Sequence, residues 1–244
     1  MDVGWFLRER VKFIRQLYAN AAAPFVERQR QIEAEEQPFE PVYDESGEPR
    51  FELEWNEADR SRHVPPGYAC VSMLSDSLKV FFATWERLIG VARDPATDSV
   101  RKKRGFVAGY AAFFEARLHV RLADSGVDLE LLEEIVLVRN RVQHAESLTT
   151  MLPSHAEKDL DRLKNPYFLD ASEHEILARS DGDGESAWLM APTIKVTAGR
   201  LNGVLDAVDR LADLGGRRAR TVPLRAWPAL RAGGAGDHLS GGNP

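Results

Sequence analysis

The sequence predicts a mainly α-helical protein: an up-and-down helical bundle of about five helices with two small β-hairpin insertions. Over several long stretches, apolar residues recur every three or four positions, which is the spacing of one face of an α-helix. Capping residues or glycines mark the ends of these stretches. Two segments rich in Pro, Gly and Asp interrupt the helical pattern, and each is typical of a hairpin.

The first predicted helix covers residues 3–36, with a kink or break near Pro24, because proline lacks the backbone N–H that a helix interior needs. Residues 37–66 are expected to form the first insertion, because Pro38, Pro41 and Pro49 interrupt the helical pattern there. A short hairpin is predicted there around Ser46-Gly47.

The second predicted helix begins after Gly67 and ends near Gly90. A third helix follows the Asp-Pro-Ala-Thr-Asp-Ser stretch, with Asp98 or Ser99 as its cap, and continues to about Ala123. Both helices carry many aromatic residues at helical spacing, so they are expected to build much of the core.

Asp128 can cap a fourth helix that runs through His144 to about Thr149. Residues 151–192 form the second predicted insertion, in which residues 175–180 and 186–190 read as the strands of a hairpin.

The last predicted helix runs from about Thr193 to Leu214. Residues 1–214 are therefore expected to form one helical domain. The Arg-, Gly- and Pro-rich tail, 215–244, is expected to be disordered because it has too little apolar surface to offset its ordering entropy.

The composition narrows the range of functions. The formal net charge of −6 argues against a protein that coats nucleic acid, although it leaves room for a local phosphate site. Cys70 is the only cysteine, which excludes an internal disulfide and a cysteine-based zinc site and predicts a cytoplasmic location. The sequence has no signal-peptide pattern and no long apolar run, so no membrane association is expected. Nucleotide-binding glycine motifs and metal-ligand spacings are missing, which predicts no cofactor and no metal.

Three polar residues, Arg139, Asn140 and His144, interrupt the apolar pattern of the fourth helix. Asn140 and His144 are four positions apart and share a helix face. Arginine is a permanent, forked donor for phosphate oxygens, and histidine exchanges a proton near neutral pH. The group is therefore a candidate site that activates an RNA 2′-hydroxyl and stabilises the charge on the phosphate. The alternative is a solvated helix edge on which Arg139 and Arg141 pair with Glu133, Glu134 or Glu146, while His144 only ends an apolar face.

Residues 139–144 (Arg-Asn-Arg-Val-Gln-His) resemble the Arg-polar-x-x-x-His signature of the HEPN superfamily. Its members are four- to five-helix domains found in bacterial toxins, defence proteins and RNA-processing factors. The resemblance covers residues 68–150 and, as a fold, residues 3–214. It implies a metal-independent endoribonuclease with Arg139 and His144 as catalytic residues and Asn140 as their polar partner. It also implies a homodimer that brings two motifs together.

Basic residues outside the motif are candidates for RNA binding: Arg101, Lys102, Lys103, Arg104 and Arg141. The run 101–104 is expected in the first turn of the third helix, where positive charge opposes the helix dipole. This unfavourable placement hints at an anionic partner. A solvated basic turn is the simpler explanation.

The sequence thus predicts a HEPN-like endoribonuclease, in a toxin or phage-defence role, that acts on RNA and pairs with a second copy, an antitoxin or another protein. One alternative is a non-catalytic HEPN-like module that binds a nucleotide or a protein. Another is a structural helical domain that dimerises through an aromatic face. Trp5, Phe81, Phe82 and Trp85 are expected to serve either the core or such a face.

Overall fold

The computed structural model describes residues 2–40, 51–90, 93–144, 152–180 and 191–218. Within these ranges the chain forms eight α-helices and no β-sheet, so a mainly helical bundle is confirmed. No helix in the described part of the chain is long and apolar enough to cross a bilayer.

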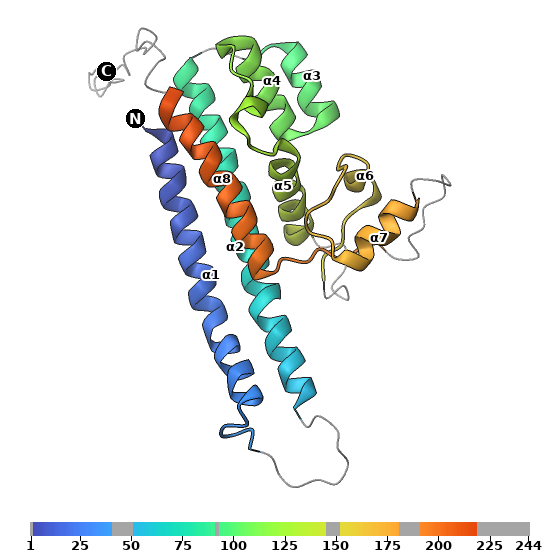
Figure 1. Cartoon of the computed structure of the whole chain (residues 1–244). Helices are drawn as coiled ribbons and strands as arrows, with labels where there is room; N and C mark the ends of the chain where they lie inside the picture. The colour runs from blue at the N-terminus through green and yellow to red at the C-terminus, as the bar shows by residue number, and fades with distance from the viewer. Residues whose placement is uncertain (1, 41–50, 91–92, 145–151, 181–190, 219–244) are drawn as a thin grey trace, which may run out of the picture.

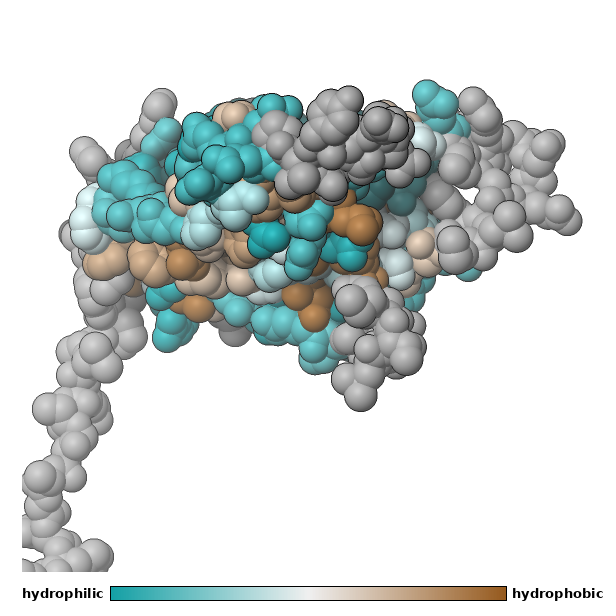
Figure 2. Space-filling view, turned by 90° about the horizontal axis from the view of Figure 1, so that it is seen from below, coloured by the Kyte–Doolittle hydropathy of each residue, from teal (hydrophilic) through white to brown (hydrophobic). Residues whose placement is uncertain are grey.

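Three long helices lie side by side: α1 (Val3–Glu33), α2 (Glu52–Ile89) and α8 (Ala198–Arg218). α1 and α2 form a long antiparallel hairpin that projects beyond the rest of the molecule, and α8 packs against both of them (Figure 1). α5 (Leu129–Gln143) packs against α2 as well. On the end of the molecule to which the hairpin projects, apolar and polar residues are interspersed (Figure 2).

Shorter elements surround α5. α3 (Pro95–Arg104), α4 (Phe106–Leu118) and the 3-10 turn η1 (Leu122–Ser125) lie near its first turns, whereas α6 (Glu157–Leu160) and α7 (Ala171–Ser180) lie to one side of it (Figure 1).

The predicted hairpins are not seen among the described residues. Residues 51–55, expected at the end of the first hairpin, belong to the start of α2, and residues 175–180 are helical in α7. The sequence signal for α7 is a capping box: Asp170 accepts the N–H of Glu173 (2.9 Å), and the Glu173 carboxylate accepts the N–H of Asp170 (3.0 Å). The remaining strand segments, 41–50 and 186–190, lie outside the described residues.

The second helix begins at Glu52 and not after Gly67, because it continues through Pro65 and Pro66. Its first half packs on α1, where the Trp55 indole N–H donates to Glu33 at 2.9 Å. These contacts offset the helical hydrogen bonds that the proline pair cannot make.

The first helix, likewise, is one continuous element through Pro24, without the expected break. The last helix begins at Ala198, later than predicted, and extends to Arg218. Residues 215–218, expected to be part of the tail, are therefore helical, and residues 219–244 lie outside the described part of the chain.

The single helix predicted to end near Ala123 is two helices separated at Gly105, where the chain adopts φ +110 and ψ 178. The cap of the first is Asp94, which accepts the N–H of Thr97 at 2.8 Å, and not Asp98 or Ser99. The break depends on α5, because the carboxylate of Glu133 takes the place of a local cap for α4.

The core is formed by residues of α1, α2, α4, α5 and α8. Phe82 stacks on Tyr110 with ring centroids 5.0 Å apart, and Trp85 meets Phe114 edge-to-face at the same distance. Phe81, Phe82 and Trp85 are buried, which confirms their predicted core role, whereas Trp5 is half exposed.

Candidate functional site at the end of helix α5

The motif residues occupy the last turn of α5. Asp128 caps the start of this helix as predicted, since its carboxylate accepts the N–H of Glu130 and Leu131. His144 is the C-terminal cap, and its N–H donates to the carbonyl of Asn140 at 3.0 Å. The side chains of Asn140 and His144 are exposed. Both are therefore accessible to a ligand.

Arg139 is held between α5 and α2. Its Nε lies 3.3 Å from Oδ1 of Asp76, although the two atoms lack the alignment of a hydrogen bond and the Nε is buried. One terminal nitrogen donates to Asn140 Oδ1 at 3.4 Å. With 22% of its side chain exposed, Arg139 is anchored but not sealed from solvent.

Lys79 of α2 adds a second cation beside Arg139. Burial lowers the pKa of Lys79 first, and the positive charge of Arg139 lowers it further, while Asp76 opposes the shift. Two cations thus share the neighbourhood of one carboxylate. That balance favours an anion at this point of the surface.

Arg141 lies on a different side of α5. Its Nε is 2.9 Å from Oδ2 of Asp159, and only 18% and 9% of the two side chains are exposed. His155 is buried beside this pair, and burial lowers its pKa to about 4, so it is neutral at physiological pH. Arg141, a predicted RNA-binding residue, therefore attaches α6 to α5.

The Arg141–Asp159 pair gives a stability prediction. Arg141→Ala should lower the free energy of unfolding by about 2 kcal/mol, because Asp159 would keep a buried charge without its closest cation. Urea denaturation measures this, with Lys102→Ala as an exposed control. Strictly additive effects of Arg141→Ala and Asp159→Ala would contradict the pairing.

The basic run 101–104 lies elsewhere, and its predicted position was wrong. These residues form the last turn of α3 and not a first turn. Their positive charges therefore interact favourably with the helix dipole. The guanidinium of Arg101 lies over the ring of Phe106 at 5.2 Å. The run ends next to Gly105, which touches Glu133, and Glu133 precedes His144 by roughly 16 Å along α5. The structure does not bring the run together with the motif.

Glu133 and Glu134 of α5, which the sequence offered only as ion-pair partners of Arg139 and Arg141, are buried and bind backbone N–H groups. Glu134 accepts the N–H of Tyr167 at 2.7 Å and of Phe168 at 2.9 Å, and burial raises its pKa to about 7. Glu133 accepts the N–H of Phe106 and Val107 at 3.0 and 2.7 Å, and burial raises its pKa too. Two adjacent acidic residues inside an otherwise apolar stretch were the sequence signal that could have predicted buried carboxylates here.

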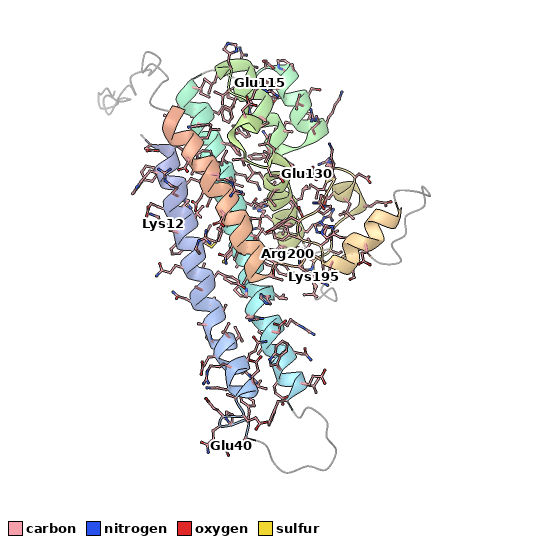
Figure 3. All side chains as sticks on the ribbon, viewed as in Figure 1. Lys12, Glu40, Glu115, Glu130, Lys195 and Arg200 are labelled. Atoms are coloured by element: carbon pink, nitrogen blue, oxygen red, sulfur yellow. The ribbon has the colours of Figure 1, made fainter. Side chains whose placement is uncertain are left out.

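The segment before α7 is attached to α5 and α8. Glu130 of α5, labelled in Figure 3, accepts the N–H of Asn165. The distance of this bond is 2.8 Å. At the start of α8, Arg200 donates to the carbonyls of Leu169 and Lys195. A small pocket beside Glu130 is lined by Asp128, Leu131, Glu134, Asn165 and Tyr167.

The described residues contain no cluster of three or more side chains suited to hold a metal ion. Comparison of the chain with protein-family models, with curated proteins and with solved structures gives no match.

Proposed function

We propose that the last turn of α5 is the active site of a HEPN-like, metal-independent endoribonuclease with a toxin or phage-defence role in the cytoplasm. The observation that carries this proposal is that Arg139, Asn140 and His144 share one exposed helix end, with Arg139 anchored beside them by Asp76. RNA is the proposed substrate, and a second copy and an antitoxin or other protein are the proposed partners.

In this reaction the RNA 2′-oxygen attacks the adjacent phosphorus, and the bond from phosphorus to the 5′-oxygen breaks. His144 acts as the acid/base group and accepts the proton of the 2′-hydroxyl, and water gives a proton to the departing 5′-oxygen. Arg139 stabilises the negative charge that develops on the phosphate oxygens, and Asn140 orients the imidazole. The products are a 2′,3′-cyclic phosphate and a 5′-hydroxyl. The nucleophile belongs to the substrate, so no metal has to supply it.

The neighbours of Arg139 fit a phosphate ligand. Its partner Asp76 is half exposed, so an incoming phosphate can compete for the guanidinium at the surface. Lys79 supplies a second positive charge near the same point.

The test is incubation of the purified full chain with total cellular RNA in EDTA. The parent should cleave RNA and leave 2′,3′-cyclic phosphate ends, and Arg139→Ala/His144→Ala should lower the rate at least ~100-fold. A matched control is His119→Asn/Arg121→Ala, which removes the same residue types from an exposed site; asparagine tolerates the positive φ of residue 119. Cleavage by the Arg139/His144 variant at the parental rate would contradict the proposed site.

The second candidate is a non-catalytic module that binds a nucleotide or a protein through the same helix end. The Arg139–Asp76 contact favours it, because a carboxylate already balances the charge that catalysis would use. This candidate predicts RNA or nucleotide binding by the parent without cleavage. Titration calorimetry should then show weaker binding by the Arg139→Ala/His144→Ala variant.

A further inference from the structure

Two serines of α2, Ser72 and Ser75, carry buried hydroxyls that make no hydrogen bond. Only 9% of Ser72 and 0% of Ser75 is exposed. A buried serine in a helix can donate to the carbonyl four residues earlier, as Ser77 of α2 does to Met73 at 2.7 Å. A buried polar group without a partner costs free energy, so the two hydroxyls point to a ligand. We call Ser72 and Ser75 the serine pair.

The serine pair lies on the face of α2 that is turned toward α5. Asp76 follows Ser72 by four positions, and Lys79 follows Ser75 by four, so all four residues share one helix face. Asp76 contacts Arg139 of α5, and Lys79 lies close enough to Arg139 for their charges to repel. α2 and α5 pack directly against each other, which explains why both serines are buried.

The serine pair is level with the last turn of α5. Phe82 of α2 packs on Phe106, whose N–H donates to Glu133 of α5. Six residues earlier in α2, Asp76 meets Arg139, which is six residues later in α5. The two helices therefore run antiparallel. With equal rise along both, the serine pair lies level with the turn that carries the candidate site.

A third buried atom without a hydrogen bond lies at the same contact, namely Nε of Arg139. The described part of the chain has four such side-chain atoms, and the fourth is Nε2 of His155. His155 lies beside Asp159 and Arg141, on a different side of α5. Three of the four atoms thus gather where α2 meets the end of α5.

The chemistry of these groups fits an oxyanion. Arg139 and Lys79 bring two positive charges to this contact, and Asp76 brings one negative charge. Guanidinium and ammonium groups only donate hydrogen bonds, and serine hydroxyls can donate as well. A phosphate group offers several charged acceptor oxygens, which form stronger hydrogen bonds than neutral acceptors do. A water molecule fits less well, because neither cation can accept one of its protons.

We propose that the serine pair, Nε of Arg139 and the ammonium of Lys79 form an oxyanion site that holds a phosphate group between α2 and the last turn of α5. Asp76, which faces Nε and is half exposed, turns to solvent as the phosphate enters. The serine hydroxyls are covered, so entry also requires the last turn of α5 to move outward, and helix ends open readily. The inference rests on the proposed function for assigning this phosphate to an RNA strand.

The test is urea denaturation of the purified full chain in inorganic phosphate and in sodium chloride of equal ionic strength. A ligand that binds only the folded state should raise the parent's ratio of folded to unfolded chain about tenfold at ten times its dissociation constant. Ser72→Ala/Ser75→Ala should lose this rise. In chloride this variant should be at least as stable as the parent, because the hydroxyls make no bond and alanine favours a helix.

Ser77→Ala is the matched control. Ser77 is also a buried serine of α2, but its hydroxyl is bonded to Met73 and it is not part of the oxyanion site. This variant should keep the parental response to phosphate. The general effect of phosphate on apolar burial acts on all three proteins alike, so the difference between them reports the site.

An equal response to phosphate in the parent and in Ser72→Ala/Ser75→Ala overturns the inference. A parent that is equally stable in phosphate and in chloride overturns it as well. Both results are independent of RNA cleavage, so they are distinct from a failure of the proposed nuclease, which the EDTA assay reports.

A second arm replaces inorganic phosphate with a 2′-deoxy dinucleotide, which offers a phosphodiester but lacks the 2′-oxygen needed for cleavage. A response to both ligands that depends on the serine pair supports the site and assigns it to the phosphodiester of a nucleic-acid strand. A response to inorganic phosphate alone supports the site and assigns it to a free phosphate.

Discussion

Replacing Gly105 with alanine is expected to lower the free energy of unfolding by at least ~3 kcal/mol. At φ +110 and ψ 178 the backbone is in a region that only glycine occupies readily, and an L side chain there costs about 1–3 kcal/mol. A Cβ would also lie 2.2 Å from Oε1 of Glu133. Moving that carboxylate away would leave the N–H groups of Phe106 and Val107 without their acceptor, at about 1–3 kcal/mol each.

Gly126→Ala is the control for this prediction. Gly126 also has a positive φ, +72, but a Cβ there would meet nothing within 4 Å. Its replacement should cost only about 1 kcal/mol, for the backbone strain alone. Urea denaturation of both variants measures the difference, which reports the collision with Glu133. Equal costs would show that the carboxylate can move aside freely.

Stability should also depend on the protonation of Glu134. Its pKa is raised to about 7 when folded, from an ordinary value of 4.5, because burial disfavours the charged form. The folded state therefore binds the proton more tightly than the unfolded state. The contribution to stability is fully present below pH 4.5 and is lost as the pH rises through 7, a change of roughly 3 kcal/mol.

The measurement is the free energy of unfolding from urea titrations between pH 5 and 8, for the parent and for Glu134→Gln. Other groups titrate in the same range, so the difference between the two proteins isolates Glu134. The glutamine variant should lose this part of the pH dependence. It should also be less stable than the parent at pH 5, because one of two backbone donors would face an amide NH₂. Glu115→Gln, at an exposed carboxylate near the end of α4, is the control and should keep the parental slope. Parallel profiles for parent and Glu134→Gln would contradict the assignment.

Local signals in the sequence predicted part of the fold. Apolar periodicity located the helices that become α1, α5 and α8, and Asp128 was identified as the cap of α5. The predicted helix boundaries were wrong where contacts between distant parts of the chain determine them. Pro65 and Pro66 lie inside α2 because α1 supports its first half, and Gly105 divides α3 from α4 because Glu133 reaches it from α5.

The candidate site could also be predicted only where residues close together in the sequence determine it. Spacing on one helix predicted that Asn140 and His144 are neighbours, and both lie exposed at the end of α5. It could not reveal that Asp76 and Lys79 of α2 flank Arg139, since those residues are some sixty positions earlier in the chain. Nor could it separate Arg141 from the motif, because Asp159 draws it toward α6.

The backbone hydrogen bonds to Glu133 and Glu134 have a consequence for local unfolding. The amides of residues 106 and 107 in α4 and of residues 167 and 168 before α7 all donate to side chains of α5. None of these four amides can be released from its carboxylate while both α5 and its own segment stay in place. Amide hydrogen exchange should therefore proceed at all four through a shared opening with the middle of α5. The helix that carries His144 thus joins segments from three parts of the chain into one cooperative unit.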